Sequence, residues 1–159
     1  MKRYLGLQAC LIASVALFFG AAFAQSTAPS PVRVALKGYD PVAYFTEGKP
    51  VKGSNAIAYD FDEARYYFSS PKHRDLFAGN PDRYAPRFGG YCTGSMSRGV
   101  KNEGDPEIWV IEEGRLYVFG SGKGDEEGKA KGRAGVATLK ADPKQLAELA
   151  RRNWEGMRK

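Results

Sequence analysis

Apolar and polar positions alternate in two pairs of short segments, and a turn signal separates the members of each pair. The first pair covers residues 56–61 and 65–68. The second pair covers residues 108–111 and 116–119, and Gly114 between them can adopt a positive φ angle. Since a short turn joins neighbouring antiparallel strands, this pattern predicts two β-hairpins, both of which contribute aromatic side chains to the core.

Helix starts are marked by short polar residues that stand directly before a proline. The polar residue can act as the N-cap, and the proline is suited to the first position of the helix. The four pairs are Asp40 with Pro41, Ser70 with Pro71, Asn80 with Pro81, and Asp142 with Pro143. After the last pair, apolar residues at helical spacing predict one stripe that packs on the sheet. That stripe consists of Leu146, Leu149, Ala150, Trp154 and Met157.

Together these signals predict a single α+β domain, in which a small antiparallel β-sheet carries short helices and a C-terminal amphipathic helix. We expect Phe77, Tyr84, Trp109 and Tyr117 to share one core. Residues 120–141 are glycine-rich and charged and show no apolar period over most of their length, so they predict a loop. Residues 142–159 form the final helix, packed on the same domain. No internal repeat is evident in this pattern.

The first 24 residues have the features of a secretory signal. Lys2 and Arg3 precede an apolar segment at residues 9–19, and Ala22 and Ala24 give the small-x-small form of a cleavage site. A membrane anchor fits less well, because the fully apolar run is short and a cleavage site follows it. We therefore expect a periplasmic or secreted protein with no transmembrane segment after cleavage, in which residues 25–33 form a flexible leader.

Charge and cysteine content narrow the classes of partner. Without residues 1–24 the chain has 22 basic and 18 acidic residues. Acids and bases alternate through the middle of the chain, which is typical of a solvated surface and argues against nucleic acid. Basic residues predominate over residues 129–159, so an anionic surface or a periplasmic protein is a candidate partner. Cys92 would be the sole cysteine after cleavage and would have no partner for an internal disulfide.

Several ordered motifs between residues 34 and 119 resemble a known family. Residues 66–77 read YYFSSPKHRDLF, and Pro81 and Tyr84 follow. Residues 38–45 read GYDPVAYF, residues 89–92 read GGYC, and residues 104–119 read GDPEIWVIEEGRLYVF. This series resembles the YHS domain, and in particular its longer, exported branch. The resemblance implies a YHS-like domain over residues 34–119.

The resemblance also implies a departure from the metal chemistry of short YHS domains, which is thought to depend on three cysteines. Ala43 and Ser69 stand at two of these positions and His73 stands at the third. A thiolate-rich zinc site is therefore not available. His73, Cys92 and Met96 still offer an imidazole, a thiolate and a thioether, and this donor set suits copper. Our leading hypothesis is a non-enzymatic binding module that holds a transition metal, preferably copper, through these residues.

Other interpretations stay open at this point. Cys92 can serve a thiol-dependent redox protein, although there is no second cysteine to resolve an intermediate. The domain can also be an interaction module for a protein or polymer, without small-molecule chemistry. In that case His73 is a surface residue, while Cys92 and Met96 only fill the core. No catalytic residue is assigned, because residues 94–99 do not match the nucleophile elbow of serine hydrolases.

The signal segment generates the first prediction. The exported protein should begin at Gln25, because cleavage is expected after Ala24. Intact mass spectrometry of protein recovered from the export compartment measures this directly. Retention of Met1, or a lipid on Cys10, would contradict the assignment.

Overall fold

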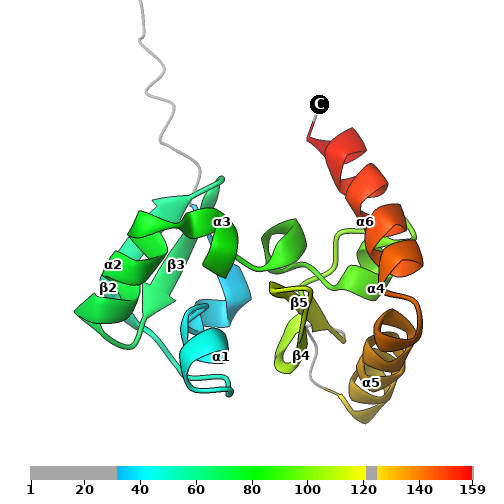
Figure 1. The fold of residues 1–159 in the computed structure, drawn as a ribbon, viewed down its shortest axis with the longest axis horizontal. Coiled ribbons are helices and arrows are strands. Elements are labelled where there is room, and N and C mark those ends of the chain that lie inside the picture. The colour runs from blue at the N-terminus through cyan, green and yellow to red at the C-terminus, as the bar shows by residue number, and fades with distance from the viewer. Residues whose placement is uncertain (1–31, 121–124, 159) are drawn as a thin grey trace, which may run out of the picture. The chain divides into compact units, whose positions relative to one another are not determined.

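The computed structural model describes residues 32–120 and 125–158, which belong to one compact unit, Pro31–Lys159. It has the predicted α+β fold, with small sheets and helices packed on them (Figure 1). The predicted signal segment, and the leader up to residue 31, lie outside the described residues. Among those described, no helix combines the length and the apolar character needed to span a membrane.

The elements form two successive halves with the same order: a 3-10 turn, a short helix, a β-hairpin and two further helices. The first half is preceded by strand β1 (Arg33–Val34), which pairs in parallel with β3. It contains η1 (Ala35–Gly38), α1 (Ala43–Thr46), β2 (Ser54–Phe61), β3 (Ala64–Phe68), α2 (Pro71–Gly79) and α3 (Pro81–Tyr84). The second half contains η2 (Arg87–Gly90), α4 (Thr93–Met96), β4 (Asp105–Glu112), β5 (Arg115–Phe119), α5 (Glu126–Ala141) and α6 (Pro143–Met157).

The two hairpins share their register as well as their place in the order. In the first, Ala58 pairs with Tyr67, and an irregularity separates this pair from the one that Ser54 makes. In the second, Trp109 pairs with Val118, and the same irregularity follows the pair made by Asp105. The paired positions recur at one constant spacing along the chain. The structure therefore contains an internal repeat that the sequence pattern did not reveal.

The segment before each hairpin has the same backbone conformation and hydrogen bonds in both halves. Each 3-10 turn contains residues with left-handed backbone, among them Leu36 (φ 51°) and Phe88 (φ 56°), and ends at a glycine. The carbonyl of that glycine accepts from a second glycine just before the hairpin. Gly53 N–H donates to Gly38 O over 2.9 Å, and Gly104 N–H donates to Gly90 O over 3.2 Å.

Three apolar clusters replace the single core that we expected. One lies in the first half around Phe77, with Tyr84 packed against it, and another lies in the second half and includes Tyr117. The third joins the halves: it contains Tyr44 and Val118, and Trp109 packs against it. Each hairpin buries its own aromatic face, so the predicted core residues are divided among three clusters.

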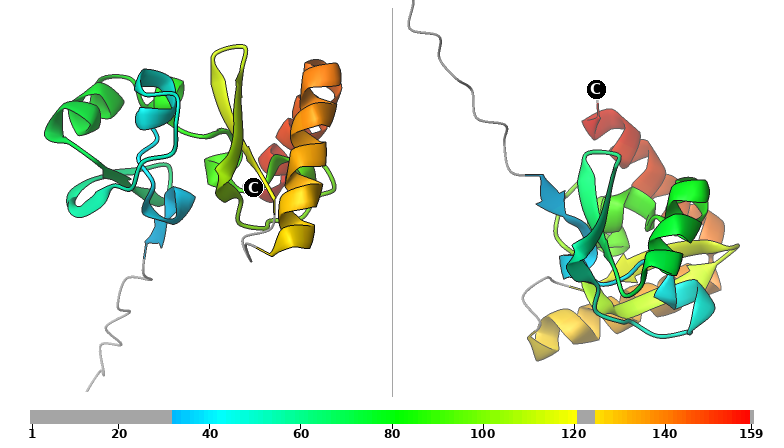
Figure 2. Two further views of the ribbon diagram at one scale, coloured as in Figure 1. Left: turned by 90° about the horizontal axis from the view of Figure 1, so that it is seen from below. Right: turned by 90° about the vertical axis from the view of Figure 1, so that its left-hand side faces the viewer.

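Residues 126–141 form helix α5, so the predicted loop over residues 120–141 is wrong for most of its length. The glycines that suggested a loop instead permit close packing (Figure 2). A Cβ atom on Gly132 would lie 2.8 Å from Gly120 Cα, and one on Gly135 would lie 2.6 Å from the Phe119 ring. Real Cβ atoms rarely come so close to a neighbour, so only glycine lets α5 lie this near β5 and the residue that follows it.

Helix α6 begins as predicted, with the Asp142 carboxylate accepting from Gln145 N–H over 3.0 Å. Its main neighbours are α4 and α5 rather than the sheet on which we expected it to pack. Ala150 is buried, whereas Leu149 is 39% exposed and does not belong to the buried stripe. Asn153 donates to the carbonyls of Met96 and Ser97, which fastens α6 to the end of α4.

The close approach of α5 generates a stability prediction. Gly132→Ala should lower the free energy of unfolding by about 1–2 kcal/mol, because overpacking against Gly120 outweighs the gain in helix propensity. Gly156→Ala is the matched control, since no atom lies within 4 Å of a Cβ there, and it should stabilise by about 0.5–1 kcal/mol. Denaturant unfolding measures both. Equal effects of the two substitutions would contradict the packing account.

Candidate functional site

The structure places the three predicted metal ligands in different halves. His73 lies in α2 of the first half, whereas Cys92 and Met96 lie in the second half. Met96 is fully buried within an apolar cluster. Within residues 32–120 and 125–158, no three His, Cys, Asp or Glu side chains gather closely enough to hold a metal ion. The structure does not bring His73 and Cys92 together, and copper binding by this set stays a prediction that the arrangement does not favour.

His73 instead belongs to a hydrogen-bonded cluster centred on Asp40, whose side chain is completely buried. The Asp40 Oδ2 atom lies 2.7 Å from His73 Nδ1 and accepts from Ser69 N–H over 2.8 Å and from Ser69 Oγ over 2.7 Å. Because an ionised carboxylate can only accept, Nδ1 carries the proton. The other ring nitrogen, Nε2, lies 3.4 Å from Thr46 Oγ1.

The second oxygen of Asp40 accepts hydrogen bonds in the turn that leads into the short helix α1. Asp40 Oδ1 accepts from Val42 N–H over 2.8 Å and, more weakly, from Ala43 N–H over 3.4 Å. Helix α1 begins at Ala43 with Val42 as its N-cap residue, so the prediction that Asp40 caps a helix begun by Pro41 is wrong. The Asp40 carboxylate instead closes the turn before α1, and the sequence did not reveal that it also holds Ser69 and His73. Ala43, Ser69 and His73 are the positions at which the resemblance implies metal ligands, and all three adjoin Asp40.

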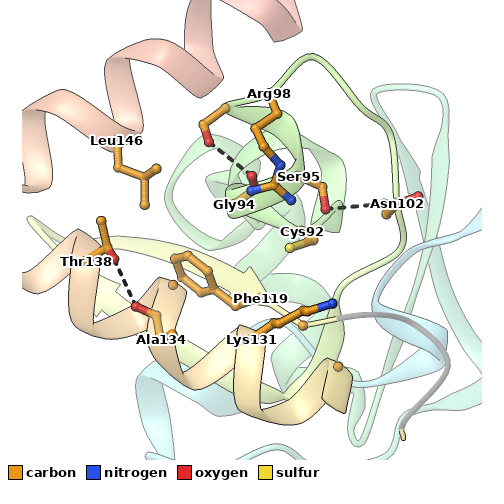
Figure 3. A pocket seen from close by; sticks show the side chains of 15 residues that line it. Cys92, Gly94, Ser95, Arg98, Asn102, Phe119, Lys131, Ala134, Thr138 and Leu146 are labelled. Carbon is orange, nitrogen blue, oxygen red and sulfur yellow. Dashed lines mark hydrogen bonds between the residues drawn. The ribbon is translucent and has the colours of Figure 1, made fainter.

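Cys92 borders a cavity of about 650 Å³ in the second half, between α4, α5 and the end of β5 (Figure 3). Its side chain is 6% exposed, and its sulfur makes no hydrogen bond with the described residues. Phe119 and Leu146 give the cavity apolar walls. Arg98 and Lys131 also line it, and no acidic side chain among the described residues does. The cavity therefore combines apolar surface with positive charge.

The two cations of the cavity differ in their pairing. Lys131 forms an ion pair with Glu127 one helical turn away, so its charge is largely compensated. The guanidinium of Arg98 has no hydrogen-bond or ion-pair partner among the described residues. An unpaired guanidinium offers several N–H donors in a planar fork, which matches a carboxylate or phosphate group.

This cavity is the counterpart of the Asp40 cluster in the other half. Asp40 and Cys92 each follow the tyrosine that makes an isolated β-bridge at the end of a 3-10 turn. Their N–H groups donate over the same distance, 2.8 Å, to Val51 O and Asn102 O, which hold equivalent places before the hairpins. The thiol of Cys92 thus stands where the first half has a buried carboxylate.

The partners of Asp40 also have counterparts. Ser69 directly follows β3, and Gly120 directly follows β5. His73 and Gly128 both donate their N–H to an N-cap side chain, that of Ser70 in α2 and of Asp125 in α5. Gly120 and Gly128 line the cavity beside Cys92. Replacement of a serine and a histidine by glycines leaves this site open in the second half.

Comparison with known proteins adds no further assignment, because no family model, no curated protein and no solved structure matches the chain. The signal that reveals the paired sites was nevertheless present in the sequence. Identical residues stand at equivalent places of the two halves. They are Gly38 and Gly90, Tyr39 and Tyr91, Gly53 and Gly104, Ile57 and Ile108, Tyr66 and Tyr117, and Phe68 and Phe119.

The Asp40 cluster generates a stability prediction. Asp40→Asn should cost roughly 3 kcal/mol or more, because it removes the charge that several buried donors and the His73 ring face. Asp60→Asn is the control, since Asp60 pairs with Arg65 on the surface, where both side chains are about half exposed. Such pairs contribute little, and the control should unfold almost as the parent does. Comparable midpoints for both variants in thermal unfolding would show that the cluster does not hold the first half together.

Proposed function

We propose that the protein is an exported, YHS-like binding module that holds a small anionic ligand in the cavity beside Cys92. The observation that carries the proposal is that this cavity is the open counterpart of a site that the chain's own side chains fill in the first half. In the first half, Asp40, Ser69 and His73 fill this site with their own side chains. In the second half, the equivalent space is open to a ligand.

Size and charge support a small molecule as the occupant. Ligand cavities commonly have volumes of about 300–1,000 Å³ and combine apolar walls with a few polar groups, as this one does. The unpaired Arg98 favours an anionic group, and the absence of acids from the lining removes the repulsion that an anion would meet. Phe119 and Leu146 favour an apolar body on the same ligand.

The alternative hypotheses receive less support from the geometry. A redox role for Cys92 requires a resolving thiol, and the described residues contain no second cysteine. A docking role for the basic C-terminal residues gains nothing from α6, where Arg151 is already paired with Glu148 and Glu155. The predicted signal segment supports action outside the cytoplasm.

Calorimetric titration of the mature protein with small carboxylates and with inorganic phosphate tests the proposal. At least one carboxylate with an apolar body should bind with one-to-one stoichiometry. Arg98→Gln should weaken that binding roughly tenfold or more, because a hydrogen bond to a charged group contributes about 1.5–3 kcal/mol.

Arg152→Gln is the matched control. It removes the same charge from an exposed arginine of α6 that does not line the cavity, so the affinity should stay unchanged. Equal weakening by both variants would point to a general effect of net charge. Absence of binding by every probe would overturn the proposed function and leave the interaction-module hypothesis.

A further inference from the structure

We propose that the ligand of this cavity is a planar nitrogen heterocycle that carries a carboxylate. The inference rests on the proposed function and defines its ligand class. Its basis is the chemistry of the side chain that fills the equivalent site in the first half. There the occupant is the imidazole of His73, 12% exposed and held by Asp40 at Nδ1.

The second half has a glycine where the first half has the residue that carries this ring. Gly128 stands at the helix position of His73, and Gly132 follows it one turn later on the same side of the cavity. A Cβ on Gly132 would lie 2.8 Å from backbone atoms of Gly120, so even alanine does not fit there without displacement. That contact lies where α5 packs on Gly120, whereas Gly128 borders the cavity and has no side chain to place in it.

In the first half, the Asp40 carboxylate contacts the ring nitrogen of His73. The second half has the Cys92 thiol at this place, and a thiol can also form hydrogen bonds. Cys92 stands at the place of Asp40, is 94% buried, and its sulfur lacks a hydrogen-bond partner among the described residues. The thiol is a weak donor and its sulfur a weak acceptor, so either can serve a ligand in the cavity. A ring N–H can donate to this sulfur, or the thiol can donate to an unprotonated ring nitrogen.

The remaining lining fixes the other features of the ligand. The ring of Phe119 and the side chain of Leu146 offer apolar surfaces to a flat ring (Figure 3). The guanidinium of Arg98, an exposed residue in the turn after α4, is suited to a carboxylate on that ring, whereas Lys131 is already paired with Glu127. A neutral heterocycle would leave Arg98 unpaired, and an aliphatic acid would leave Cys92 unpaired.

The deciding experiment compares two carboxylates of similar size, imidazole-4-carboxylate and cyclopentanecarboxylate, by calorimetric titration of the mature protein. The heterocyclic acid should bind at least tenfold more tightly. Cys92→Ala should remove most of this preference while cyclopentanecarboxylate binding stays unchanged. Gly128→His should abolish binding of both acids, because it restores the side chain that fills the first-half site.

His73→Gly provides the complementary test in the first half. It should lower the melting temperature, and added imidazole should restore a large part of the loss, whereas added cyclopentanol should not. His73→Ala serves the same purpose if the glycine variant does not fold. This result would show that the site selects a nitrogen heterocycle by its hydrogen bonds, and lack of rescue in both variants would remove the basis of the inference.

The outcomes separate this inference from the proposed function. Equal affinity for the two acids, with both weakened by Arg98→Gln, would overturn the heterocycle and leave the anion-binding function intact. Absence of binding by both acids and by phosphate would overturn both. Tight binding of the heterocyclic acid that Cys92→Ala does not alter would also contradict the assignment, because the sulfur would then play no part in recognition.

Discussion

The buried carboxylate of Asp40 is the interaction on which the organisation of the first half depends. One of its oxygens accepts from Val42 N–H in the turn before α1, and the other holds the residue after β3 and the imidazole in the first turn of α2. Three segments that are distant in sequence thus meet at a single charge. A buried charge is tolerated only when hydrogen bonds compensate the loss of water, and here every neighbouring segment supplies a donor. The cluster is consequently closed to ligands.

The second half uses the same backbone framework without that charge. With Cys92 in place of Asp40, and glycines in place of Ser69 and His73, no polar side chain draws α5 onto the end of β5. Close contact between glycines and neighbouring backbone holds α5 there instead. This packing leaves a cavity bordered by a thiol and two cations. The repeat therefore yields one site that stabilises the fold and one that is available for binding.

The halves are joined by apolar packing, by a buried hydroxyl and by ion pairs such as Arg33–Glu103 and Arg158–Asp62. Tyr44 of the first half lies among Leu116 and Val118 of the second, and its hydroxyl donates to Pro106 O over 2.9 Å. Burial raises the pKa of this hydroxyl well above its ordinary value, so it stays a neutral donor. Because the joint lies against the hairpin that carries β5, it fixes the strand whose end borders the cavity. The position of the cavity thus depends on contacts made by both halves.

Local signals in the sequence determined the hairpins and the helix starts at Ser70, Asn80 and Asp142, because turns and caps depend on neighbouring residues. Tertiary contacts decided features that depend on residues distant in sequence, namely the helix at residues 126–141 and the neighbours of His73 and Cys92. The glycines of α5 suggested a loop because their helical role exists only against β5. His73 and Cys92 suggested one metal site, but the fold places them in separate halves, where His73 contacts Asp40 and Cys92 stands at the place equivalent to Asp40. Contacts between residues that are distant in sequence decide which side chains lie together. In a single sequence, the trace of these contacts is the spacing of the repeated residues.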